Sequence, residues 1–187
     1  MQTKRPGKIR IIGGKWRGRR FPVLDIVTLR PTPDRIRETL FNWLQPVIAG
    51  ASCLDLFAGT GALGLEAMSR GASEVILIEN NTAAALQLSR NIEVLAATGI
   101  SLFRNNALEW LQQNKQKFDI VFLDPPFRQG LVEKSCAIIL AHGCLKKNAL
   151  VYIETDKTFQ LPDGLTIKKQ GSAGQVRFML LTSSAED

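Results

Sequence analysis

Short apolar runs alternate with amphipathic segments over most of the chain, and this alternation predicts its secondary structure. The runs predict strands at 52–57, 74–79, 100–104, 118–124 and 148–154. Between them, apolar residues at helical spacing predict helices at 62–70, 82–97, 106–114 and 130–142. Apolar strands separated by amphipathic helices are typical of a parallel sheet covered on both faces. The pattern therefore indicates an α/β fold with a doubly wound, mostly parallel sheet.

The two ends of the chain depart from this alternation. Strand-like runs at 165–170 and 176–182 flank a glycine-containing turn, and we expect them to close a seven-stranded sheet as an antiparallel hairpin. Runs at 8–12 and 19–24 predict a second hairpin at the amino end. A helix is expected over 33–47, with Thr32 as its cap and Pro33 in its first turn. We therefore divide the chain into an amino-terminal extension, 1–46, and a larger domain, 47–187.

The net charge of +7 is concentrated in the amino-terminal extension. Residues 1–46 hold eleven Lys and Arg side chains against three acids, whereas the remaining residues hold 13 against 14. Clustered Lys and Arg suit a polyanion, because they displace counterions from its phosphates. Apolar residues interleaved with these charges argue against a disordered, merely solubilising tail. We expect phosphate contacts from five cations and base stacking by one aromatic ring: Arg10, Lys15, Arg17, Arg30, Arg35 and Trp16.

Composition excludes several other classes of protein. The chain has 187 residues, of which 45% are hydrophobic and 22% charged, as expected for a globular domain. It contains neither an apolar run of membrane-spanning length nor a secretion-signal pattern, so we expect a cytoplasmic protein. Three cysteines without a CxxC pair and a single histidine give no support for a metal site or a His-dependent triad. We take a monomer as the default.

A glycine-rich loop follows the first strand of the alternating region. Gly59, Gly61 and Gly64 match GxGxxG between a strand and a helix, a pattern that dinucleotide-binding proteins also use. Asp55 lies just before the loop, where a carboxylate is unfavourable beside a pyrophosphate but favourable beside an ammonium or sulfonium group. S-adenosylmethionine carries both cations. We expect this cofactor to contact the segment through Asp55, Ala58, Gly59 and Gly61.

Two further strand ends carry polar residues that suit the same cofactor. Glu79 ends the second strand of the alternation, where it could accept both ribose hydroxyls. Asn106 and Ala107 follow the third strand, where they could meet the adenine edge. Structural roles stay open for both polar side chains, because Glu79 could serve the strand end alone and Asn106 is a good helix cap.

The tetrapeptide Asp124-Pro125-Pro126-Phe127 directly follows the apolar run at 118–123. Prolines donate no backbone hydrogen bond and leave the carbonyls of this turn free to accept one. An exocyclic amine could donate to the Asp124 carboxylate and the Pro125 carbonyl while Phe127 stacks on its ring. The alternative is a Pro-Pro turn with Phe127 in the core. We expect Asp124, Pro125 and Phe127 to be catalytic, with Asp124 also beside the cofactor; whether Asp124 removes a proton or only orients the amine stays open.

Several blocks of the chain together resemble a known family. The segments 9–18, 29–44 and 173–176, with D-x-F-A-G-T-G at 55–61 and D-P-P-F at 124–127, are similar to the RsmD family of bacterial 16S ribosomal RNA guanine-N2 methyltransferases. The resemblance covers nearly the whole chain. It implies a Rossmann-like class I methyltransferase fold, S-adenosylmethionine as methyl donor, and a guanine in the assembled or assembling small ribosomal subunit as target. Pro33, where many members have threonine, is a small departure outside the expected chemistry.

Other functions remain open on the residues alone. A DNA or RNA adenine-N6 methyltransferase would also use a DPP-aromatic motif. An NAD-dependent oxidoreductase fits the literal glycine pattern, but Asp55 and the lack of a hydride-transfer constellation oppose it. A non-catalytic RNA-binding protein that retains an old cofactor fold is the third alternative, and the intact acids at Asp55, Glu79 and Asp124 weigh against it.

Overall fold

The central sheet has seven strands in the order β5-β4-β3-β6-β7-β9-β8, which confirms the predicted α/β architecture. The computed structural model describes residues 7–24, 32–126 and 130–183. The strands from β5 to β7 run parallel, and β9 inserts antiparallel between β7 and β8. The bounds are β3 (Ser52–Asp55), β4 (Glu74–Ile78), β5 (Ile100–Phe103), β6 (Phe118–Leu123), β7 (Leu145–Thr155), β8 (Leu165–Ala173) and β9 (Val176–Ser183).

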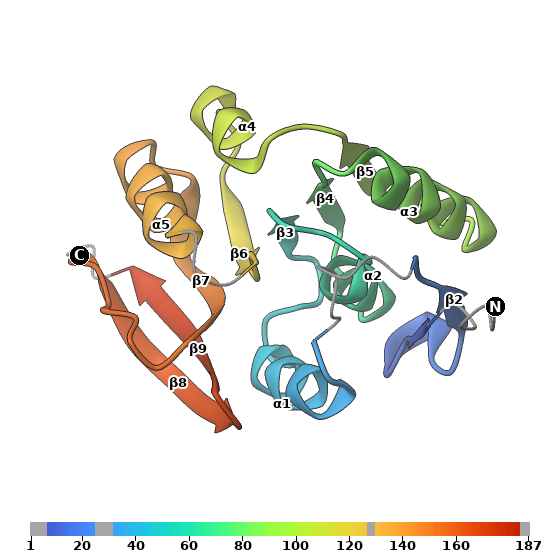
Figure 1. Cartoon of the computed structure of the whole chain (residues 1–187), viewed down its shortest axis with the longest axis horizontal. Helices are drawn as coiled ribbons and strands as arrows, with labels where there is room; N and C mark the ends of the chain where they lie inside the picture. The colour runs from blue at the N-terminus through green and yellow to red at the C-terminus, as the bar shows by residue number, and fades with distance from the viewer. Residues whose placement is uncertain (1–6, 25–31, 127–129, 184–187) are drawn as a thin grey trace, which may run out of the picture.

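Helices cover both faces of the sheet, as Figure 1 shows. They are α1 (Asp34–Leu44), α2 (Ala62–Ser69), α3 (Thr82–Val94), α4 (Ala107–Gln113) and α5 (Leu131–Ala141). Successive strand residues point to opposite faces, so that Cys53 packs with α1, α2 and α3 while its neighbour Leu54 packs with α4 and α5. The two hydrophobic layers explain why the strands are nearly continuous apolar runs.

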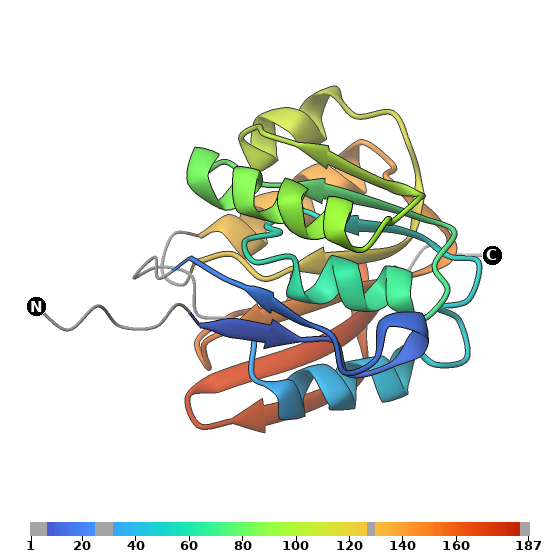
Figure 2. The same ribbon diagram turned by 90° about the vertical axis from the view of Figure 1, so that its right-hand side faces the viewer.

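The amino-terminal hairpin lies alongside α2 (Figure 2). It consists of β1 (Lys8–Arg10), a 3-10 turn η1 (Gly14–Trp16) and β2 (Arg20–Pro22). Its apolar side chains Ile11, Trp16 and Phe21 join the same hydrophobic cluster as one face of the sheet. The division of the chain at residue 46 stays a prediction, and the two parts share a core.

A fully buried carboxylate on α2, Glu66, fastens the hairpin to the sheet domain. Its two oxygens accept hydrogen bonds of 2.7 Å from the backbone N–H groups of Ile12 and Gly13. The Arg70 guanidinium donates to it at 2.7 Å, and the Arg37 guanidinium lies 3.8 Å away. Backbone donors and two cations compensate for the removal of this charge from water.

Two expected strand boundaries and one expected helix cap are corrected by the structure. Strand β7 begins at Leu145, which pairs with Phe118, and the ladder shifts register over the exposed Lys146 and Lys147 before Leu150 pairs with Ile120; an apolar pattern cannot reveal this start. Strand β8 continues through Gly171 to Ala173, which leaves only two residues, with Gly174 at φ 61°, in the turn. The prediction that Thr32 caps α1 is wrong: Pro33 occupies the cap without a side-chain hydrogen bond. The Thr32 hydroxyl instead contacts the Asp124 and Glu154 carboxyl groups.

None of the helices in the described ranges is both long and apolar enough to cross a membrane.

Candidate active site

Four of the predicted polar segments meet at one edge of the sheet. Asn106 follows β5, Glu79 follows β4, the glycine loop follows β3 and Asp124 follows β6, and these four strands are consecutive in the sheet. The connections run in opposite directions from β3 and β6. Open α/β sheets bind ligands outside the carboxyl ends of their strands at such a switch point.

The glycine loop needs its glycines for backbone reasons. Gly61 has a φ of 79°, and a Cβ at this position would lie 2.4 Å from Leu88 on α3. A Cβ on Gly64 would lie 2.2 Å from Leu77 of β4. The loop is therefore pressed between α3 and the sheet, and the backbone at Gly59 and Gly61 forms its outer turn.

Asp55 lies beneath this loop. Its side chain accepts a 3.0 Å hydrogen bond from the Gly64 N–H, and the residue is only 2% exposed. Burial raises the pKa of Asp55 to about 7, the nearby Glu79 adds to the shift, and the Gly64 hydrogen bond opposes it. The Asp55 side chain thus holds the first turn of α2 by a hydrogen bond. Its direct contact with a cofactor stays a prediction.

Glu79 joins the glycine loop to the start of α3. One carboxylate oxygen accepts a 2.7 Å hydrogen bond from the Gly59 N–H, and the other accepts a 2.6 Å bond from the Asn81 N–H. Each carboxylate oxygen can accept a second hydrogen bond. The side chain can therefore hold the loop and still receive the two hydroxyls of a ribose.

Asn106 caps α4, one of the two roles that the sequence left open. Its side-chain oxygen accepts from the Leu108 N–H at 2.9 Å and the Glu109 N–H at 3.2 Å. The side-chain amide is still a donor. Ala107 is buried in the first turn of α4. Contact of these two residues with an adenine ring stays a prediction.

Asp124 is part of a polar cluster that the sequence did not reveal. Thr32 Oγ1 lies 3.0 Å from Asp124 Oδ2 and 2.7 Å from Glu154 Oε1. The Tyr152 hydroxyl donates to the same Glu154 oxygen at 2.8 Å. Burial raises the pKa of Asp124 well above its usual value, and the neighbouring Glu154 raises it further. Burial also raises the pKa of Glu154.

A signal for Glu154 was present in the sequence. Like Glu79 and Asp124, it is an acid that directly ends an apolar run, here at the end of β7. The rule that parallel strands present their carboxyl ends at one edge would have selected it. Thr32 gave no such signal, because a threonine before a proline and an acid is typical of a helix start.

A cavity of about 270 Å³ lies beside the Pro125-Pro126 turn that follows Asp124, on the β7 side. Its walls include Pro125 and Pro126, the start of α5, and Glu154, Thr155 and Asp156. Pro125 is buried, as expected for a turn that forms a wall of the site. Phe127 lies outside the described residues. The acidic and carbonyl groups at this cavity suit a ligand edge that carries hydrogen-bond donors.

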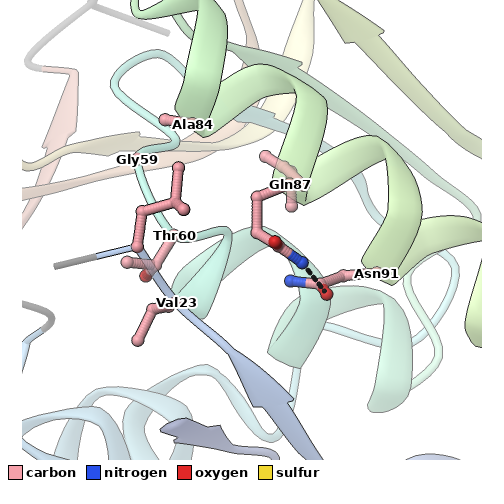
Figure 3. Close-up of a pocket in the computed structure, with 8 residues that line it drawn as sticks. Val23, Gly59, Thr60, Ala84, Gln87 and Asn91 are labelled. Atoms are coloured by element: carbon pink, nitrogen blue, oxygen red, sulfur yellow. Dashed lines mark hydrogen bonds between the residues drawn. The ribbon is translucent and has the colours of Figure 1, made fainter. Parts of the chain in front are cut away.

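A second, much smaller cavity lies between the glycine loop and α3 (Figure 3). Val23, Gly59, Thr60 and Gln87 line it, and Gln87 donates to Asn91 at 3.1 Å. Its volume of about 10 Å³ is comparable with a single water. This cavity therefore marks the contact between the extension and the loop, and it cannot hold an adenosine.

The predicted RNA-binding residues divide into two groups. Arg10, Lys15, Arg17 and Arg35 are exposed, and Arg10 pairs with Asp34 at 3.2 Å; Arg30 lies outside the described residues. Trp16 is only 8% exposed and packs in the core, so little of it is open for stacking, and its contact with an unpaired base stays an untested prediction. Lys15 lies over that ring, 4.3 Å from its centroid. Glycine at position 14 allows the close packing, since a Cβ there would lie 1.8 Å from the Ser69 carbonyl.

The described residues contain no group of three or more His, Cys, Asp or Glu side chains that could hold a metal ion.

Comparison with known proteins places this site in a family. The family model described as "Conserved hypothetical protein 95" matches residues 9–182. Ribosomal RNA small subunit methyltransferase D of Escherichia coli is 47% identical over 96% of this chain and 92% of that protein. Its Haemophilus influenzae counterpart is 44% identical over 93% of each. A solved structure of the putative methyltransferase yhhF from Escherichia coli covers 96% of this chain and 100% of its own, with 47% identity and a TM-score of 0.89.

These relatives are methyltransferases, which counts against the oxidoreductase alternative. The match also runs through the hairpin, the glycine loop and the Asp124 turn. The chain belongs to the family described as conserved hypothetical protein 95, the RsmD family that its motifs resemble.

Proposed function

We propose that this protein transfers a methyl group from S-adenosylmethionine to the exocyclic N2 amine of a guanine in 16S ribosomal RNA, within the assembled or assembling small subunit. The observation that carries the proposal is the position of Asp124, a carboxylate at the sheet's switch point that directly precedes the Pro125-Pro126 wall of the 270 Å³ cavity. The names of the relatives supply the class of RNA. Such a substrate places the protein in the cytoplasm.

The strand ends fit the methyl donor. Glu79 has acceptor capacity for the ribose, Asn106 retains its amide for the adenine, and Asp55 and Asp124 provide negative potential toward ammonium and sulfonium groups. S-adenosylmethionine, when bound, supplies an electrophilic methyl on sulfur. The chain's own groups do the remaining work.

Asp124 and the Pro125 carbonyl would orient the amine. Each accepts one N2 hydrogen, which turns the nitrogen lone pair toward the methyl, and Phe127 would stack on the base. With the donor bound, N2 would take the methyl and the donor would become a neutral thioether; the excess proton on N2 would pass to Asp124 or to water. Alignment of well-oriented reactants can supply about 7–11 kcal/mol of barrier reduction. The target base must leave its stack to reach this turn.

The exposed cations of the hairpin and α1 would hold the RNA backbone. Arg10, Lys15, Arg17 and Arg35 lie on the surface of the described residues. Phosphate contacts position a nucleic acid without reading its sequence. Trp16 has no part in this proposal, because its ring is in the core.

The direct test is methyl transfer to small subunits isolated from a strain that lacks the modification. We expect tritiated methyl to enter 16S RNA and mass spectrometry to locate it on guanine N2. Asp124→Ala should abolish transfer but retain cofactor binding, whereas Asp163→Ala, at an exposed carboxylate between β7 and β8, should not change it. Methylation of adenine, or of DNA instead of RNA, would contradict the proposal. Near-normal transfer by Asp124→Ala would contradict the assignment of the site.

A thermal-shift assay tests the cofactor separately. S-adenosylmethionine and S-adenosylhomocysteine should raise the melting temperature, since a ligand that binds only the folded state stabilises it. NAD should not. A rise in melting temperature with NAD and none with S-adenosylmethionine would reject S-adenosylmethionine as the cofactor.

A further inference from the structure

One wall of the 270 Å³ cavity is a buried carboxyl group that the proposed function does not use. Glu154, at the end of β7, lines the cavity and is only 4% exposed. The Pro125-Pro126 turn and the apolar residues Leu131 and Val132 also line it. The cavity has the volume of about nine water molecules in the liquid. It therefore has room for a flat ring on the scale of a purine base.

A bridging hydroxyl, Thr32 Oγ1, fixes the orientation of this carboxyl group. It lies 2.7 Å from Glu154 Oε1 and 3.0 Å from Asp124 Oδ2, and the Tyr152 hydroxyl donates to the same Glu154 oxygen at 2.8 Å. In the part of the chain that the structure describes, no group donates a hydrogen bond to the other oxygen, Oε2. Nor is Oε2 among the buried, unpartnered side-chain atoms of that part, so it retains contact with solvent. Oε2 is thus the oxygen available to a ligand in the cavity.

The same contacts indicate where the negative charge of the two carboxyl groups lies. A threonine hydroxyl has one hydrogen, and its shorter contact is with Glu154, so Glu154 accepts from both Thr32 and Tyr152. Burial raises the pKa of Glu154, but these two donors lower it. At Asp124, burial and the neighbouring Glu154 both raise the pKa, to well above its usual value. Asp124 therefore holds the proton of the pair until a positive charge lies beside it, and Glu154 is the ionised member.

The walls of the cavity favour a neutral group that carries hydrogen-bond donors. Glu133 and Asp156 line the cavity together with Glu154, and its described lining residues include no Lys, Arg or His. Three carboxyl groups disfavour a phosphate or any other anion. An ionised carboxylate accepts hydrogen bonds and cannot donate them. The edge of a ligand that faces Glu154 must therefore supply an N–H or O–H group.

We propose that this cavity receives the base to be methylated, and that Glu154 selects guanine by accepting a hydrogen bond from its N1–H. This inference rests on the proposed function and deepens it, because it names the group that determines base specificity. The N1–H and the N2 amine are neighbours on the Watson–Crick edge of guanine, the edge by which flipped bases are recognised. The Glu154 and Asp124 carboxyl groups are neighbours across Thr32. N1–H can therefore face Glu154 while the N2 amine faces Asp124 and the Pro125 carbonyl.

Adenine is the base that this arrangement rejects. With its N6 amine at Asp124, adenine would present the lone pair of N1 to Glu154, and two acceptors would face each other without a hydrogen. The carboxylate would then lose its water and gain no partner, which is costly. A site built to bind an N–H group rejects an analogue that lacks it far more strongly than an apolar pocket does. Glu154 would thus restrict to guanine a turn that suits the amine of either base.

Glu154→Gln reverses the polarity of this group and keeps its shape. The Thr32 and Tyr152 hydroxyls hold an acceptor at the Oε1 position, so the amide NH₂ takes the place of Oε2 and opposes the guanine N1–H. We expect kcat/KM for methyl transfer to small subunits to fall about 10- to 100-fold, as for the loss of one positioned base contact. Glu93→Gln, at an exposed position at the far end of α3, is the matched control and should keep the wild-type value. Equal kcat/KM in the wild type and Glu154→Gln would overturn the proposal.

Binding of free nucleosides to the wild type requires neither a variant nor turnover. Saturation-transfer NMR measures guanosine, 1-methylguanosine and adenosine, with S-adenosylhomocysteine present to occupy the cofactor site. Nucleosides carry no phosphate that could bind the basic hairpin. Guanosine should bind at least about tenfold more tightly than the other two, since both lack the N1–H. Equal binding of all three nucleosides, or no binding of guanosine, would overturn the proposal.

The two measurements separate this inference from the proposed function. If the wild type prefers guanosine but does not methylate small subunits, the guanine cavity stands and the proposed reaction is the part that fails. If small subunits are methylated on guanine N2 and Glu154→Gln behaves as the wild type, the proposed reaction stands and the role of Glu154 is rejected.

Discussion

Two buried acidic clusters in this molecule have opposite surroundings. Glu66 receives two backbone N–H donors and lies beside two arginines, Arg37 and Arg70. Asp124 and Glu154 have each other, a threonine and a tyrosine, and no cation among the residues that the structure describes. A compensated charge holds two parts of a fold together. An uncompensated pair stores unfavourable interaction at the place where a ligand will bring positive charge.

The largest effect should come from removing the charge of the uncompensated pair. Asp124→Asn keeps the shape of the side chain, and we expect kcat/KM for methyl transfer to fall about 10²- to 10⁴-fold, in the range of a lost acid–base or orienting group. The free energy of unfolding should stay constant or increase, because one buried carboxyl is neutralised. Parallel kinetics and urea denaturation measure both. A marked loss of stability would place Asp124 in the same class as Glu66.

Removing the compensated charge should have the opposite signature. Glu66→Ala removes the acid that Arg70 bonds and frees two buried backbone donors, while Arg37 keeps its ion pair with Asp34. We therefore expect the free energy of unfolding to fall by about 3–5 kcal/mol. Glu38→Ala, at an exposed position of α1, is the control and should stay within about 0.5 kcal/mol of wild type. Urea unfolding of the wild type, Glu66→Ala and Glu38→Ala measures these differences in the free energy of unfolding. Equal free energies of unfolding for Glu66→Ala and Glu38→Ala would mean that the hydrogen bonds and ion pairs of Glu66 contribute little to stability.

Asp55 offers an intermediate case, since it has a backbone donor but forms no ion pair with the part of the chain that the structure describes. Its pKa is raised from 3.8 to about 7 by burial, so the folded state binds a proton more tightly than the unfolded state does. Its contribution to stability is therefore complete at low pH and is lost as pH rises from about 4 to about 7. Denaturation at several pH values should show a weaker fall over this range in Asp55→Asn. Identical slopes would contradict the raised pKa.

The smallest effect is expected at an exposed ion pair. Lys146 lies 2.8 Å from Asp119, with side chains that are 43% and 36% exposed. Lys146→Met should cost about 0–1 kcal/mol, because water and salt screen such a pair. Unfolding in low and high salt measures the difference. A cost that persists undiminished in high salt would show that packing of the lysine stem, instead of charge, is responsible.

Periodicity predicted the sheet but not the contacts that complete the site. The alternation of apolar runs and amphipathic segments predicted the parallel strands. The positions of Asp124 and Glu79 at strand ends predicted that they lie at the same edge of the sheet. Thr32 was misassigned as a cap because its partners, Asp124 and Glu154, are distant in sequence. The burial of Trp16 was also not foreseen, since its backbone N–H bonds the distant Ser69 hydroxyl. The local pattern of apolar residues predicts which face of a helix or strand is buried. It does not predict which distant residues that face will contact, because these depend on the packed fold.

The start of β7 shows the same limit on a smaller scale. Lys146 and Lys147 lie outside the predicted strand 148–154, yet β7 includes them. The pairing of Leu145 with Phe118, followed by a shift of register before Leu150 pairs with Ile120, carries the strand through these two exposed lysines.

The bridge at Thr32 also bears on when this protein becomes competent during its synthesis. Its hydroxyl reaches across 92 residues to Asp124 and 122 residues to Glu154. Contacts of such large sequence separation close late, after local elements have formed. A nascent chain therefore cannot assemble the three-residue bridge until the end of β7 has left the ribosome.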